Sequence, residues 1–218
     1  MSGILDPQTP TDIVARTQRA RIVDALVESC AAKTYPGTTI SDIVARASIS
    51  RTTFYKHFPD KRACFDAAVD SCVEEVATVA RAAHEPADPP GAAVTKATAA
   101  ILALLAARPA LAQLLTGDAP GVEPAVVERY RKLLIPSVAQ LWERAGASSD
   151  PDMDPNLAFG RAQVLIFKYA AAGEASALPQ ILPELVYLAV APFAGHEEAL
   201  ERVRIAEAKI ASERSLSR

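Results

Sequence analysis

The stretch from residue 38 to residue 61 constrains the fold of this chain more than any other part, and it reads TTISDIVARASISRTTFYKHFPDK. Its first half places apolar residues three and four positions apart, which is the spacing of a short helix with one buried face; these residues are Ile40, Ile43, Val44 and Ala47. A second short helix follows after a turn and ends before Pro59, because proline cannot continue a helix. The stretch therefore predicts two short helices joined by a tight turn.

The second of these helices is predicted over residues 51–57, with Ser50 as its N-cap. Ile49 forms an apolar plug in the turn, and Phe54 and Phe58 are expected to face inward. The remaining side chains are polar or basic and are expected to face outward: Arg51, Thr52, Tyr55, Lys56 and His57.

The rest of the chain repeats the helical spacing, and no segment alternates apolar and polar residues as a half-buried strand would. Proline and glycine fall mainly between the periodic segments, where they end one helix and allow the next to begin. The further helices are predicted over residues 13–34, 61–83, 91–107, 109–116, 123–145, 154–172, 178–191 and 197–212. The fold class predicted is all-α, with about nine to ten helices.

The charge of the chain is divided unevenly. Residues 1–62 contain nine Lys and Arg against six Asp and Glu, a net charge of +3, whereas residues 63–218 contain 14 against 20, a net charge of −6. A basic front on an acidic body suits a protein whose front meets a polyanion. We therefore predict a DNA-binding helix-turn-helix domain at residues 11–62 and a larger helical domain at residues 63–218.

Several other function classes lack support in the sequence. None of the common catalytic or phosphate-binding motifs is present, so no catalytic residue, metal site or cofactor is expected. The three cysteines have no CxxC spacing and are expected to be buried and reduced, as in a cytoplasmic protein. There is no uncharged apolar run of about 18 residues and no secretory signal, so no membrane span is expected.

The outward-facing side chains of the helix predicted at 51–57 are of the types that bind DNA bases and phosphates. A short helix fits the major groove, where Arg51 can bind guanine bidentately and Thr52 can meet a base edge or a thymine methyl. Lys61 begins the next helix, where the ammonium and the helix amides could hold one phosphate. The DNA-contact candidates are Thr39, Ser41, Ser50, Arg51, Thr52, Thr53, Tyr55, Lys56, His57 and Lys61.

The order of residues in this stretch resembles the signature of the TetR/AcrR family of bacterial regulators. The matching features are a Thr-rich helix start, an Ile-Ala pair, a turn, a Ser cap, a Tyr-x-x-Phe and a following Lys. Here they stand as Thr38-Thr39, Ile43-Val44, Ala47-Ser48-Ile49, Ser50, Tyr55-Lys56-His57-Phe58 and Lys61, and the resemblance covers residues 13–66. Ser48 replaces the usual glycine, which costs about 1 kcal/mol if that residue has a positive φ.

The resemblance implies a homodimeric repressor that a small ligand releases from a palindromic operator on double-stranded DNA. It also implies that the last two large helices of each subunit, here 154–172 and 178–191, pack into a four-helix interface. The interface candidates are Gly160, Leu165, Ile166, Leu182, Leu185 and Val186, each of which is read equally well as ordinary core.

A ligand pocket in the larger domain is sought among aromatic and isolated polar residues on apolar helices. The candidates are Phe65, Gln113, Tyr130, Trp142, Phe159, Gln163 and Phe167, and core packing is the competing interpretation of each. The composition favours an apolar or aromatic effector.

One alternative function stays open at this point. The chain could be a helical bundle that binds an apolar ligand, with its N-terminal hairpin making a protein contact instead of a DNA contact. The two functions differ in their response to salt. DNA binding gains free energy from the release of counterions, and added salt reduces this gain, so DNA affinity falls steeply as the salt concentration rises.

Overall fold

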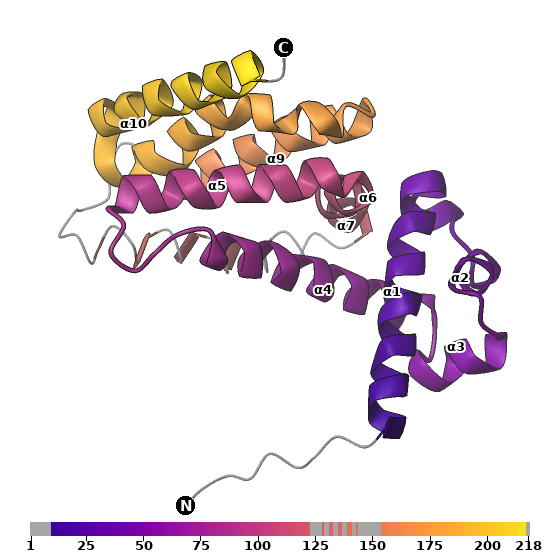
Figure 1. Ribbon diagram of the computed structural model, residues 1–218. Coiled ribbons are helices and arrows are strands. Elements are labelled where there is room, and N and C mark those ends of the chain that lie inside the picture. Colours follow the sequence, from indigo (N-terminus) through magenta and orange to yellow (C-terminus); the bar gives the residue numbers. More distant parts are fainter. Residues whose placement is uncertain are drawn as a thin grey trace, which may run out of the picture. The chain divides into compact units, whose positions relative to one another are not determined.

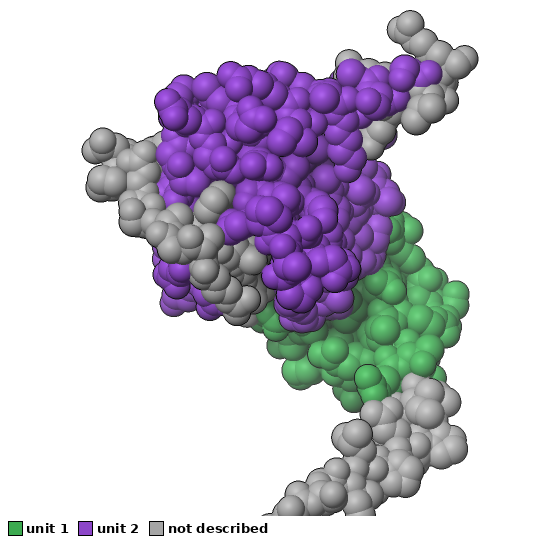
Figure 2. Space-filling view, turned by 60° about the vertical axis from the view of Figure 1, so that its left-hand side comes forward, with its two compact units in different colours: residues 1–70 green, residues 71–218 purple. Residues whose placement is uncertain are grey.

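The fold is helical throughout the part of the chain that the computed structural model describes, namely residues 10–122, 128, 131–132, 135–136, 139–140, 143 and 154–216. No strand occurs among these residues, and the all-α prediction is confirmed. The chain divides into two compact units, Met1–Asp70 and Ser71–Arg218 (Figure 2). The division falls inside helix α4 (Lys61–Ala82), the helix in which the sequence had placed a boundary.

The first unit contains α1 (Pro10–Gly37), α2 (Ile40–Ala47), α3 (Arg51–His57) and the beginning of α4 (Figure 1). Its core is built from the apolar faces that the periodicity predicted. The fully buried large side chains of this unit are Ile22, Leu26, Val27, Ile43, Phe54, Phe65 and Val69. Because α2 and α3 are only eight and seven residues long, this shared core is what keeps them helical.

The second unit contains α5 (Pro90–Ala107), α6 (Pro109–Gln113), the π-helix η1 (Leu114–Asp118), α7 (Ala119–Val122), α9 (Pro155–Ala171), the 3₁₀-helix η2 (Ala175–Ile181) and α10 (Leu182–Leu216). Three of these helices begin with proline, whose missing N–H is not needed in the first turn. Helix α5 packs against α10 and η2, and α9 packs against α10, α6 and η1.

Helix α10 is two helices that meet at Gly195, whose φ of 78° is left-handed. The chain reverses there, so that the last helix returns alongside the first part of α10 (Figure 1). The returning helix closes tightly on the start of α5, because a Cβ on Gly91 would lie 2.6 Å from Glu198 Oε1 and 2.7 Å from Arg202 Nε. The Glu198–Arg202 ion pair, 2.7 Å long, therefore lies over the first turn of α5.

Two helical stretches, Pro90–Ala107 and Ala175–Ser212, are long and apolar enough to cross a bilayer by length and composition alone. Both belong to the helical bundle of the second unit, and 28% and 50% of the residues in the apolar 18-residue segment of each are buried. The apolar core helices of a bundle give the same pattern, so the two stretches are explained by packing.

Three of the predicted interface residues prove to be core. Leu182, Leu185 and Val186 are 3%, 5% and 0% exposed within the single chain, because the first part of α10 packs on α5 and α9. Their burial within one chain favours the core interpretation of these three residues, since buried side chains have little surface to add to a dimer. A period of 3.6 shows which face of a helix is apolar but not which neighbour covers it.

Some predicted elements differ in detail from the structure. The helix expected over residues 109–116 is α6 followed by the π-helix η1, in which the helix widens by one residue per turn. The helix expected over residues 123–145 falls largely outside the described residues. The helix expected over residues 178–191 begins as η2, and Pro183 lies in the first turn of α10 as proline requires.

Candidate nucleic-acid interface

Helix α3 is held at its start by its own hydroxyl side chains. Ser50 is the N-cap, and its Oγ accepts a hydrogen bond of 3.0 Å from the backbone N–H of Thr53. The Thr53 Oγ1 lies 2.9 Å from the same Oγ. The structure therefore assigns both hydroxyl groups, which the sequence had counted as DNA contacts, to the capping of α3.

Two buried aromatic rings set the rotation of α3. Phe54 and Phe58 are 0% and 3% exposed, and their ring centroids are 5.9 Å apart. With these rings inside, four other side chains of α3 are turned to the solvent: Arg51, Thr52, Tyr55 and Lys56. The sequence prediction of which side chains of α3 face inward is confirmed for both phenylalanines.

Two members of the predicted outward face are partly engaged by the protein. Tyr55 is 52% exposed, with its ring edge against Phe54 at 5.5 Å between centroids. His57 is half-buried, and its Nε2 lies 3.4 Å from Gln18 Oε1 of α1. The exposed tip of α3 is therefore formed mainly by Arg51, Thr52, Tyr55 and Lys56.

The start of α2 is closed by a reciprocal cap. Thr39 Oγ1 accepts from the backbone N–H of Asp42 at 3.2 Å, and the Asp42 carboxylate accepts from the backbone N–H of Thr39 at 2.9 Å. Lys33 of α1 donates to the same carboxylate at 2.7 Å. The hydrogen bond from Lys33, followed by those from Thr39, holds the pKa of Asp42 well below its usual range.

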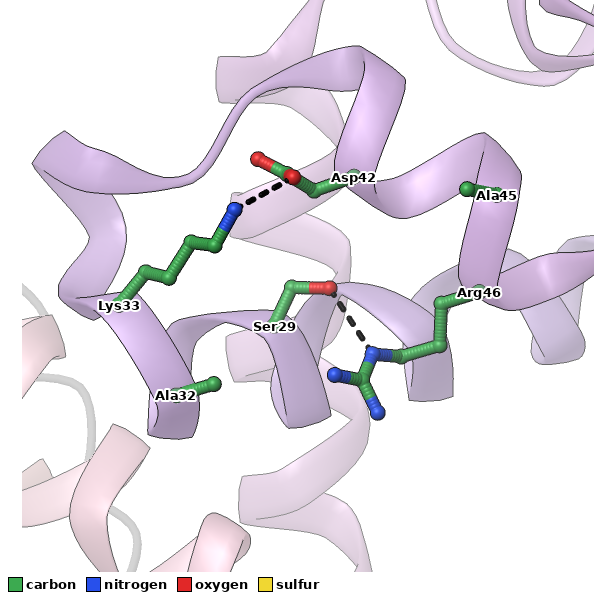
Figure 3. A pocket seen from close by; sticks show the side chains of 6 residues that line it. All are labelled: Ser29, Ala32, Lys33, Asp42, Ala45 and Arg46. Atoms are coloured by element: carbon green, nitrogen blue, oxygen red, sulfur yellow. Dashed lines mark hydrogen bonds and ion pairs between the residues drawn. The ribbon is translucent and has the colours of Figure 1, made fainter.

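Helix α1 also supports the other end of α2. Arg21 donates to the carbonyl oxygen of Ala47 at 2.6 Å, where a cation complements the helix dipole. Arg46 donates to Ser29 Oγ at 3.2 Å. A pocket of about 380 Å³ lies between the two helices, and its lining includes Ser29, Lys33, Asp42 and Arg46 (Figure 3). Its polar side chains are bonded to one another, so the pocket shows how α2 is braced on α1.

The turn between α2 and α3 passes through a left-handed residue. Ser48 has φ 53° and ψ 49°, and its N–H returns to the carbonyl of Ala45 at 3.2 Å. The next N–H, of Ile49, bonds to Val44 at 3.0 Å. These bonds close the end of α2 as a glycine turn would, but a serine there carries steric strain.

Lys61 has a different position from the one expected. Its Nζ donates to the carbonyl oxygens of Tyr35 and Thr38, at 2.9 and 2.8 Å, and lies 4.2 Å from the centroid of the Tyr35 ring. The ammonium that the sequence assigned to a DNA phosphate is therefore bound inside the protein, at the turn that leads from α1 into α2. Thr34, which begins this turn, has the strained backbone angles φ 60° and ψ 164°.

The predicted pocket residues are divided between the two units. Phe65 is fully buried in the first unit, 4.2 Å from the Tyr35 ring between centroids, which favours the core interpretation of this residue. Gln113 and Phe167 meet in the second unit at Gly117 of η1, where an added Cβ would lie 3.1 Å from Phe167 Cε2 and 4.0 Å from Gln113 Cγ. Phe159 and Gln163 are half-buried on α9, and Tyr130 and Trp142 lie outside the described residues.

Sequence reasoning missed the side chains that support the two short helices. Arg21 contacts Ala47 across 26 residues, and no local pattern indicates such a pair. The capping role of Asp42 could have been predicted from the sequence, because an acidic residue three positions after Thr39 is the pattern of a capping box.

We expect Ser48→Gly to stabilise the first unit by about 1 kcal/mol, because glycine adopts the left-handed conformation without the Cβ clash. Amide hydrogen exchange of α2 and α3 would measure the gain as slower exchange. The matched control is Ala45→Gly in the same helix. It should lower the stability by about 1 kcal/mol, because residue 45 is helical and glycine loses more backbone entropy there than alanine does. Equal loss of protection in both variants would show that residue 48 is not left-handed.

Lys61→Met should destabilise the α1–α2 turn, because it keeps the length of the side chain but removes the two charged hydrogen bonds. The expected loss is about 1–3 kcal/mol, seen as faster amide exchange in α2. Lys56→Met on the exposed face of α3 is the control and should change stability by less than about 0.5 kcal/mol. If the two variants behave alike, Lys61 does not hold the turn.

The residues that form α2 and α3 match the model of a known protein family. Residues 22–68 match the model of the family described as bacterial regulatory proteins, tetR family. No curated protein matches the sequence at a significant level.

Several solved structures share the fold. The fatty acid degradation regulator FadR from Bacillus halodurans is 16% identical with a TM-score of 0.68, covering 84% of this chain and 96% of its own. FadR from Bacillus subtilis, solved with stearoyl-CoA, is 16% identical with a TM-score of 0.66, covering 81% and 98%. A gamma-butyrolactone receptor (ArpA like protein) is 20% identical with a TM-score of 0.60, covering 92% and 99%.

The family match covers the helices whose caps and exposed face are described above, and the structural similarity extends over both units. Residues 22–68 therefore resemble the tetR family of bacterial regulatory proteins, and the chain shares its fold with solved structures of transcriptional regulators.

Proposed function

We propose that this protein is a homodimeric repressor that binds a palindromic operator through α3 and leaves it when a small, apolar ligand binds the second unit. In this proposal residues 11–62 are the DNA-binding domain, and residues 63–218 bind the ligand and form the dimer. The observation that carries it is the exposed tip of α3, where Arg51, Thr52, Tyr55 and Lys56 stand on a helix that is capped and anchored from behind.

The roles within this tip follow from side-chain chemistry. Arg51 is at the first position of α3, so its guanidinium is suited to guanine in the major groove. Thr52 is suited to an adjacent base edge, and Tyr55 and Lys56 to phosphates, with His57 at the edge of the patch. Thr39 at the start of α2 would lie nearest the backbone of the duplex.

The dimer is proposed to form through the outer face of α9. Leu157 and Val164 are 60% and 69% exposed, and seven residues separate them, so they lie on the same side of the helix. Gly160 lies between them with open space beside it, which permits close approach of a second helix. Leu165 and Ile166 are half-buried at the edge of this face. A two-fold dimer implies a palindromic operator, because each half-site meets one subunit.

The effector is proposed to be largely apolar. Helix α5 is mostly apolar, yet only 28% of its residues are buried, and many of its apolar side chains are half-buried. Phe167 is 42% exposed and lies near Gly117 of the π-helix, and π-helical turns are frequent at functional sites. The FadR protein solved with stearoyl-CoA shares this fold, which supports a ligand of the same general character.

The same fold similarity supports a cytoplasmic protein that responds to a metabolite. The alternative in which the N-terminal hairpin makes a protein contact has less support, because the tetR family match falls on the hairpin itself.

DNA binding is tested with a duplex selected by the protein from a random library and followed by fluorescence anisotropy at several salt concentrations. Arg51→Ala should lower discrimination at one base pair by about 1–3 kcal/mol, because it removes a bidentate base contact. Lys56→Ala should weaken all duplexes about equally and reduce the salt slope by about 1. Failure to enrich any sequence, or equal effects of both variants on every duplex, would overturn the proposal.

Dimer formation is tested by sedimentation of the 23.1-kDa chain. Val164→Glu should convert dimer to monomer at micromolar protein, because a carboxylate in an apolar contact loses its hydration. Ala82→Glu, at the exposed end of α4, is the control and should remain dimeric. A Val164→Glu protein that stays dimeric would place the interface elsewhere.

A further inference from the structure

The arginine at the tip of α3 is bonded to the start of α2. Arg51 Nη2 donates to Ser41 Oγ at 2.5 Å, and both residues are exposed at the surface. Arg51 is the first residue of α3 and Ser41 the second residue of α2. This hydrogen bond therefore links the start of α3 to the start of α2.

The bond restricts an otherwise flexible side chain. An arginine that binds DNA loses rotamer freedom, and that loss weakens binding unless the side chain is ordered beforehand. Arginine has five N–H donors in one plane. A bond from Nη2 to Ser41 sets the direction of that plane and leaves other N–H groups for a base.

The two ends of the bond are themselves fixed. The helix that carries Ser41 is closed at its start by Thr39 and Asp42. The helix that carries Arg51 is closed by Ser50 and Thr53. The separation of the two side chains is thus set before any DNA is bound.

We propose that Ser41 is a positioning residue for base readout: it orients the Arg51 guanidinium and determines specificity through it. The sequence had placed Ser41 among the direct DNA contacts. The inference rests on the proposed function, because it assumes that Arg51 meets a base. It adds that the selectivity of the arginine depends on a hydroxyl group in the neighbouring helix.

The test is a double-mutant cycle on the duplex selected from a random library, with anisotropy as the readout. Ser41→Ala should weaken binding to the selected duplex by about two- to tenfold, the effect of losing one ordered side chain. Binding to a duplex with the guanine pair replaced should change little. The salt slope should also stay unchanged, because no phosphate contact is lost. In an Arg51→Ala background, Ser41→Ala should have no further effect.

Two further variants sharpen the result. Ser41→Thr keeps the hydroxyl group and should restore most of the affinity. Ser212→Ala removes an exposed helix serine whose hydroxyl bonds to Ala208, and it should leave binding unchanged. An equal loss from Ser41→Ala with and without Arg51, or a lower salt slope, would make Ser41 a direct DNA contact and overturn the inference. The absence of any effect of Ser41→Ala on binding would also overturn the inference.

A measurement without DNA separates this inference from the proposed function. NMR of the Arg51 guanidinium in the free protein should show slow rotation about the Nε–Cζ bond, and Ser41→Ala should make it fast. Slow rotation together with no enriched duplex would contradict the proposed function while leaving the contact in place. Fast rotation in the unaltered protein would overturn the inference even if DNA is bound selectively.

Discussion

The attachment of α2 to α1 is the interaction on which the proposed DNA-binding surface depends. A helix of eight residues does not persist alone in water, so its position comes from its neighbours. Burial of Ile43 on α1 supplies the apolar contact, and charged side chains of α1 meet both ends of α2: Lys33 through Asp42 and Arg21 through Ala47. Since α3 follows α2 by a three-residue turn, any shift of α2 moves the exposed tip of α3.

The turn from α1 into α2 is the second constraint. Thr38 is 1% exposed, and its hydroxyl and its N–H both bond to the carbonyl of Thr34, at 2.8 and 3.1 Å. Lys61 adds two bonds from the first residue of α4. The start of α4 is thereby tied to the same few residues that precede α2. A movement of α4 would act directly on this turn, as the proposed regulatory function requires.

In the second unit, apolar residues of the same helices lie both in the core and at the surface. The first part of α10 is buried by α5 and α9, whereas the outer face of α9 keeps Leu157 and Val164 exposed. Large apolar side chains exposed on one face of a helix are the basis for the dimer surface proposed on α9. The half-buried apolar residues of α5, with Gln113 and Phe167 near Gly117, are the basis for the proposed apolar effector.

The sequence by itself determined the helical class, the approximate limits of α2 and α3, the cap at Ser50, and the inward direction of Phe54 and Phe58. These features depend on spacing and on local hydrogen bonds, which the order of residues specifies. The structure showed that Ser48 is left-handed, where the glycine pattern had made this a possibility.

Only the tertiary structure decided the partners of the long side chains and of the apolar faces. Lys61 binds two carbonyl groups instead of remaining free for DNA, and Ser41 receives the guanidinium of Arg51. Leu182 and its neighbours on α10 are covered within one chain. A side chain of four or more rotatable bonds, or an apolar stripe, can reach several partners. The partner it takes depends on where the folded chain brings residues that are distant in sequence.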